Sequence, residues 1–66
     1  DKIALFVSER GNYELRLLSS LGKELQRKKV FISEKEELDV SEVERGVYFL
    51  EISGAGYYQT IRIIKP

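Results

Sequence analysis

The sequence predicts an all-β domain that folds as a small antiparallel sandwich or barrel. Apolar residues alternate with polar ones along most of the chain, and this period of two is typical of strands that bury one face. Turn-forming residues separate the alternating segments at roughly 8–12-residue intervals, a spacing typical of sandwiches and barrels. No segment shows a sustained helical period. We therefore expect six short strands and no long helix.

Residues 2–8 and 13–17 are the first two expected strands, and a turn at residues 9–12 joins them. Each strand places its apolar side chains on one face, which we assign to the core. These inward-facing residues are Ile3, Leu5, Val7, Tyr13, Leu15 and Leu17.

The third expected strand, residues 23–31, follows a turn at residues 19–22 and is mostly polar. We expect Leu25 to point inward, and we interpret the basic run at residues 27–29 as a solvated strand face. A charged strand of this kind suits the edge of a sheet, because charge discourages pairing with other chains.

Residues 37–40 predict a short strand with Leu38 and Val40 inward, followed by a compact connection at residues 41–46. Ser41 and Glu44 match a helix capping box, which is compatible with a single helical turn. Val43 would then pack onto the core.

Residues 47–53 form the most hydrophobic segment, and both of its faces are apolar, which predicts a central strand. A hairpin turn at residues 54–56 leads to the last strand, residues 57–65, with Ile61 and Ile63 inward. One internal similarity, between residues 13–15 and residues 48–50, is too short to indicate a repeat.

Composition excludes several classes of function. The 66 residues allow a single domain and contain neither cysteine nor histidine, so thiolate chemistry and the commonest general base and metal ligand are missing. Eleven basic residues balance eleven acidic ones, which leaves no electrostatic footprint for nucleic acid or for an anionic membrane. No apolar run approaches the ~20 residues of a membrane helix. We expect no enzyme activity, no cofactor, no nucleic-acid binding and no membrane insertion.

Three further groups of residues have side chains that could form a site. No two carboxylates are placed as a glycosidase requires, and the acidic cluster at residues 34–39 is interpreted as surface rather than as a calcium site. Tyr57 and Tyr58 could form an aromatic platform for a sugar ring, but we favour cross-strand packing at the hairpin.

Three stretches, taken in order, resemble a known family. They are Tyr-Glu-Leu-Arg-Leu to Leu-Gly-Lys-Glu-Leu (13–25), Leu-Asp-Val-Ser to Gly-Val-Tyr-Phe-Leu (38–50) and Thr-Ile-Arg-Ile-Ile-Lys (60–65). Their order and spacing resemble the type A C-terminal sorting domains of type IX secretion system cargo proteins in the phylum Bacteroidetes. The family usually opens with a Pro-Asn-Pro-like strand, which is missing here, and Arg62 stands where Lys is usual.

The resemblance implies an immunoglobulin-like antiparallel β-sandwich of about six to seven short strands, residues 1–66, at the end of a longer secreted protein. It implies a non-catalytic signal that directs a cargo protein through the type IX outer-membrane translocon. A sortase-like peptidase would commonly remove the domain, and the cargo would reach the medium or the cell surface through the periplasm and outer membrane.

The same resemblance assigns recognition to residues that match the family's motifs. We expect Gly46 and Tyr48 to act mainly through structure, and the assembled surface with the last strand to be recognised. A terminal strand can present an edge for strand addition, and an exposed edge could also pair with another copy of the chain. The residues so assigned are Gly22, Gly46, Tyr48, Arg62, Ile63, Ile64 and Lys65.

The sequence leaves three other interpretations open. The first is an immunoglobulin-like accessory or spacer module of an extracellular enzyme, in contact with glycans. The second is a nucleic-acid-binding five-stranded barrel, against which the neutral charge argues. The third is an engineered sandwich, against which the irregular polar third strand argues.

Overall fold

A computed structural model describes residues 2–66 and confirms the all-β prediction. These residues form six strands and no helix, and every pair of neighbouring strands is antiparallel. The strands are β1 (Lys2–Phe6), β2 (Gly11–Ser19), β3 (Glu24–Ile32), β4 (Lys35–Asp39), β5 (Gly46–Gly54) and β6 (Tyr57–Lys65).

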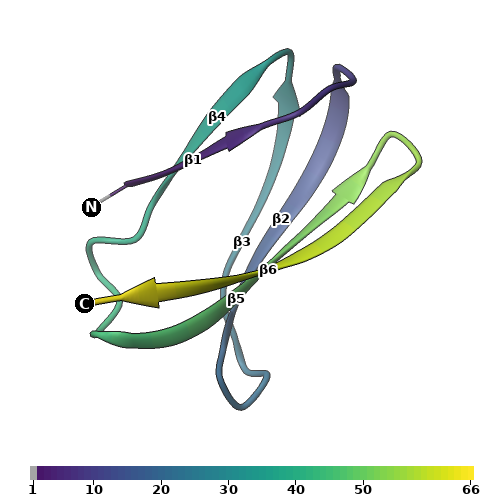
Figure 1. Cartoon of the computed structure of the whole chain (residues 1–66). Helices are drawn as coiled ribbons and strands as arrows, with labels where there is room; N and C mark the ends of the chain where they lie inside the picture. Colours follow the sequence, from purple (N-terminus) through teal and green to yellow (C-terminus); the bar gives the residue numbers. More distant parts are fainter. Residues whose placement is uncertain (1) are drawn as a thin grey trace.

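The strands form two facing sheets (Figure 1). One sheet has the order β3-β2-β5-β6 and the other pairs β1 with β4, which confirms β5 as a central strand and β3 as an edge. Alternate side chains of both sheets meet in one core, as the period of two predicts. The buried residues are Leu5, Tyr13, Leu15, Leu17, Ile32, Leu38, Val40, Tyr48, Leu50 and Ile52.

The prediction that Leu25 points into the core is wrong. The β2–β3 register shifts between Leu17, which pairs with Gln26, and Leu18, which pairs with Glu24. Leu25 is therefore the extra residue of a bulge, and it stays 40% exposed. Ile32, at the far end of β3, supplies the buried apolar side chain instead.

The connection between β4 and β5 forms hydrogen-bonded turns rather than the helical turn suggested by the capping box. The Ser41 amide donates to Asp39 Oδ1 at 2.9 Å, and the Val43 amide donates to the Val40 carbonyl at 3.3 Å. The first of these bonds lowers the pKa of Asp39. Val43 packs against the core, as predicted.

The two halves of the chain repeat one arrangement. Each half places one strand in the small sheet and then a hairpin in the large sheet. The order β3-β2-β5-β6 reads the same from either end when β1, β2 and β3 are exchanged for β4, β5 and β6. The domain is thus a pseudo-symmetric pair of three-stranded units.

The sequence similarity between the halves is longer than the residues compared above, so the interpretation that it is too short for a repeat is wrong. Residues 9–17 align without gaps on residues 44–52, with Glu-Arg-Gly-x-Tyr-x-Leu in both. Both tyrosines also make the same contact. Tyr13 Oη donates to the Glu9 carbonyl at 2.5 Å, and Tyr48 Oη donates to the Glu44 carbonyl.

Candidate recognition surface

Most of the residues assigned to recognition gather where β5 begins and β6 ends. The β5–β6 register places Gly46 opposite Lys65 and Tyr48 opposite Ile63. Ile64 and Arg62 lie on the same stretch of β6 and alternate with these inward-facing positions. The structure therefore brings together segments 46–48 and 62–65 as one surface.

Gly22 lies outside this cluster, in the turn between β2 and β3, where its amide donates to the Ser19 carbonyl at 2.9 Å. Ser19 pairs with Tyr48, so the turn lies at the same end of the sheet. A shallow pocket lined by Ser19, Leu25, Val43 and Tyr48 separates the turn from the β4–β5 connection.

Lys65 binds the β4–β5 connection through its ammonium group. Nζ donates to the main-chain carbonyls of Val43 at 2.7 Å, Val40 at 2.8 Å and Ser41 at 3.3 Å. Three carbonyl dipoles match the three donors of an ammonium. Lys65, the last residue of β6, thus holds in place a connection that lies more than twenty residues earlier in the chain.

Position 46 requires glycine because of its backbone conformation, and not because a side chain there would clash. Its φ is +152°, a region that side-chain-bearing residues rarely adopt. A Cβ built on Gly46 would meet the Tyr48 ring no closer than 3.9 Å, an ordinary contact. The Gly-x-Tyr motif therefore combines a permissive turn residue with a buried aromatic, as predicted.

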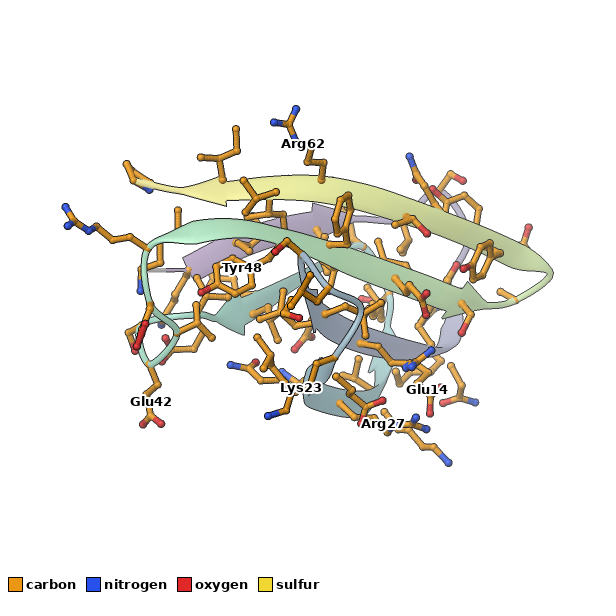
Figure 2. All side chains as sticks on the ribbon, turned by 90° about the horizontal axis from the view of Figure 1, so that it is seen from below. Glu14, Lys23, Arg27, Glu42, Tyr48 and Arg62 are labelled. Carbon is orange, nitrogen blue, oxygen red and sulfur yellow. The ribbon has the colours of Figure 1, made fainter. Side chains whose placement is uncertain are left out.

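Tyr48 is 9% exposed and points between the sheets (Figure 2), with its hydroxyl on the Glu44 carbonyl. Tyr48→Phe is expected to lower the free energy of unfolding by about 1 kcal/mol, the net value of one hydrogen bond. Chemical denaturation followed by circular dichroism would measure the change. Tyr58→Phe is the matched control, because Tyr58 is 67% exposed; equal losses in both variants would refute the structural role of the Tyr48 hydroxyl.

The outer face of the β5–β6 hairpin carries an apolar patch around Arg62. Val47 pairs with Ile64, and Phe49 pairs with Arg62 and, on its other side, with Leu18. Ile64 is 60% exposed, and Arg62 extends away from the sheet into solvent (Figure 2). Arg62 forms no ion pair with residues 2–66.

A network of ion pairs covers the rest of this outer face and joins side chains of β2, β3 and β5. Arg16 bridges Glu24 at 2.9 Å and Glu51 at 2.7 Å, while Arg27 bridges Glu24 at 2.8 Å and Glu14 at 3.1 Å. Hydrogen bonds from Arg27 and then Arg16 lower the pKa of Glu24 from 4.5 to about 2. The basic run at 27–29 is exposed to solvent as predicted, but two of its side chains form ion pairs, Arg27 in this network and Lys28 with Glu36.

The lowered pKa of Glu24 makes the stability of the folded domain depend on pH. The folded state binds this proton less tightly than the unfolded chain, so its contribution to stability is complete above pH 4.5 and is lost as the pH falls toward about 2. Glu24→Gln is expected to melt at a lower temperature than the wild type at pH 7 and at the same temperature below pH 2. Glu34→Gln, at a glutamate with no ion pair among residues 2–66, is the control; a constant gap for Glu24→Gln across this range would contradict the assignment.

The remaining candidate groups are occupied by local contacts. In the acidic cluster, Glu36 bridges Lys28 at 2.6 Å and Glu37 lies 3.7 Å from Lys35, and residues 2–66 hold no group of acidic side chains arranged to bind a metal ion. Tyr57 donates its hydroxyl to Gln59. Over the same residues, no helix is long and apolar enough to cross a membrane.

The model of one family, described as the secretion system C-terminal sorting domain, matches residues 1–66. The chain belongs to this family. Searches of curated proteins and of solved structures returned no match.

As a sorting domain of type IX secretion, the chain serves in general as a signal that interacts with the secretion machinery. Its export role implies a destination outside the cell or on the cell surface. Motif resemblance led to Lys65 and Gly46, but it gave no sign of the carbonyl groups that Lys65 binds. The repeated Glu-Arg-Gly-x-Tyr segment was a usable signal for the second tyrosine contact, because both copies are visible in the sequence.

Proposed function

We propose that this sorting domain directs a cargo protein through the type IX outer-membrane translocon, and that the translocon recognises the surface formed by residues 46–48 and 62–65. The observation that carries the proposal is the position of β6. This strand is one of the two edge strands of the large sheet, and it carries four of the seven residues assigned to recognition.

An edge strand is accessible along its whole length. A central strand such as β5 has both neighbours and offers only its outer face. β6 offers an edge, an outer face with Arg62 and Ile64, and an end that Lys65 fastens to residues 40–43. Gly46 and Tyr48 act in the proposal by shaping this surface, and Gly22 by shaping the adjacent turn.

A secretion assay tests the proposal. Residues 1–66 are fused to the C-terminus of a fluorescent protein carrying a signal peptide, and the fusion is expressed in a strain with an intact type IX system and in a translocon mutant. We expect fluorescence outside the cell only in the intact strain. Retention in the periplasm of both strains, with the domain folded, would refute the proposal and favour an accessory or spacer module.

We further propose that a sortase-like peptidase removes the domain after export. The same fusion then appears outside the cell at the size of the fluorescent protein without the domain. A full-length fusion in the medium or on the cell surface would contradict removal while leaving the export role intact.

A further inference from the structure

The two edge strands of the large sheet are equivalent in the pseudo-symmetric fold, so each is an internal control for the other. Val30 of β3 lies opposite Tyr13, as Ile63 of β6 lies opposite Tyr48. This equivalence aligns residues 26–32 with residues 59–65. Differences between the two edges are therefore differences in chemistry at matched positions.

The hairpin geometry identifies the free backbone groups of β6. Ala55 and Gly56 have φ of 52° and 74°, as in a type I′ turn, whose flanking residues Gly54 and Tyr57 form a hydrogen-bonded pair. Hydrogen-bonded pairs alternate with non-bonded pairs along an antiparallel ladder. The residues of β6 that point their N–H and C=O groups away from β5 are thus Tyr58, Thr60, Arg62 and Ile64.

The β3 edge is protected by charge. Its central positions are Arg27, Lys28 and Lys29, and charged edge residues oppose the addition of another strand. Side chains also connect β3 to the small sheet. Lys28 Nζ lies 2.6 Å from Glu36 Oε2, and Gln26 Nε2 donates to the Asp39 carbonyl at 3.4 Å.

The β6 edge has less of this protection, because Arg62 is its one charged residue at the positions that match residues 27–29. Thr60 and Ile61 stand where β3 has Arg27 and Lys28, and no side-chain hydrogen bond or ion pair joins residues 57–64 to the described residues of β1. An open groove of ≈ 290 Å³ runs between the end of β6 and the start of β1, lined in part by Ile3, Val40 and Ile63. This side of the sandwich therefore offers free backbone groups beside an apolar groove.

The charges that β6 itself carries are of one sign, and Glu51, which lies opposite Thr60 on β5, is already paired with Arg16. Residues 57–66 contain Arg62 and Lys65 and no acidic residue. Arg62 has no ion pair among the described residues. The Lys2 side chain lies at the rim of the groove and is 62% exposed, and its ion pair with Glu37 is long, at 4.0 Å. A second copy of β6 would bring like charges together, whereas an acidic strand would complement them.

We propose that β6 accepts an extended strand from its partner, and that this strand alternates apolar side chains with carboxylates. The proposal rests on the proposed function, because the partner is taken to be part of the export machinery. Main-chain hydrogen bonds to Thr60, Arg62 and Ile64 supply binding energy, and alternate side chains supply selectivity. Apolar side chains of the added strand cover the groove, and its carboxylates lie beside Arg62 on the outer face.

A probe peptide tests the edge without any secretion machinery. The probe is an acetylated and amidated peptide of alternating valine and glutamate, titrated into ¹⁵N-labelled protein and followed by the amide signals. We expect the signals of Thr60, Arg62 and Ile64 to shift while those of Lys29 and Phe31 stay. No shift at β6, or shifts that depend on protein concentration without peptide and so indicate a second copy, would overturn the proposal.

Proline variants test the backbone contacts. Thr60→Pro removes a free N–H at an edge position where proline is tolerated, and it is expected to weaken peptide binding about tenfold. Lys29→Pro, which alters a free N–H of the equivalent β3 edge, is expected to leave binding within about twofold. Equal effects of the two variants would refute a role specific to β6.

Arg62→Glu tests the charge and leaves the backbone unchanged. It is expected to reverse the preference, so that a peptide of alternating valine and lysine binds better than the valine–glutamate probe. An unchanged preference would refute the acidic partner. The secretion assay separates this proposal from the proposed function. If the wild type and folded Thr60→Pro are both exported normally, the edge proposal is refuted and the proposed function stands. If the wild type is retained in the periplasm, the proposed function is refuted, and the peptide titration alone decides whether β6 accepts a strand.

Discussion

Gly54→Ala is expected to remove most or all of the stability of this domain. A Cβ built on Gly54 would lie 2.2 Å from the Asn12 carbonyl oxygen and 2.9 Å from Tyr13 Cα. Both atoms belong to the backbone of β2, which pairs directly with Gly54 through Tyr13. The clash can be relieved only by separating the two central strands, and the φ of +144° adds a conformational cost.

The expected loss is more than about 4 kcal/mol, in the range reserved for severe steric and strain effects. A domain of this size has a total stability on the order of 3–10 kcal/mol. Circular dichroism at low temperature, followed by denaturation in urea, would measure the loss. The chain has no tryptophan, so the far-ultraviolet signal is the suitable probe.

Gly56→Ala is the matched control in the same hairpin. Its φ of +74° is also positive, but no atom lies within 4 Å of a Cβ built there. The conformational cost alone is about 1–2 kcal/mol. Similar losses for the two alanine variants would show that the close approach of β2 to Gly54 contributes nothing.

Lys65→Met is expected to give the second-largest effect, a loss of about 2–3 kcal/mol. Methionine retains an unbranched apolar stem but not the ammonium, so the Val43 carbonyl loses this donor and the Val40 carbonyl keeps only the longer bond from the Val43 amide. Hydrogen bonds to charged groups contribute about 1.5–3 kcal/mol each, but the Ser41 bond is exposed and the three bonds share one donor group, so the contributions do not add fully.

The measurement combines thermal melting with amide hydrogen exchange. A loss of this size corresponds to a fall in melting temperature of roughly 8–24 °C for a domain of this length, and exchange should accelerate at residues 41–45. Lys29→Met is the control, because the Lys29 side chain makes no hydrogen bond or ion pair with residues 2–66. Unchanged exchange at residues 41–45 in Lys65→Met would contradict the structural role of the ammonium.

The sequence predicted the strands well because one property, the alternation of apolar residues, decides both the strand and its buried face. Leu15, Leu17 and Leu50 illustrate this, since each is almost completely buried. The prediction that Leu25 points inward was wrong because a bulge after the β2–β3 turn shifts the register by one residue. Such a shift depends on the conformation of the turn, and the alternation of apolar residues within β3 does not predict it.

The recognition residues came from motif resemblance, and their roles stay predictions, as does pairing with a second copy. Their grouping depends on register. Gly46 and Lys65 are separated by most of a hairpin in the sequence and face each other only because the two-residue turn at Ala55 and Gly56 pairs them. The carbonyl groups that bind Lys65 were unpredictable for a simpler reason: every residue has a carbonyl, so no residue type marks the site.

The sequence by itself determined that the domain is all-β, which face of most strands is buried, and to which family it belongs. Those properties follow from local periodicity and from ordered motifs. Only the tertiary structure decided that Lys65 fastens residues 40–43, that Gly54 has no room for a side chain, and that β6 has an open edge while β3 is protected. The physical reason is that each of these depends on contacts between segments far apart in the chain, and such contacts exist only after the strands have paired in one register.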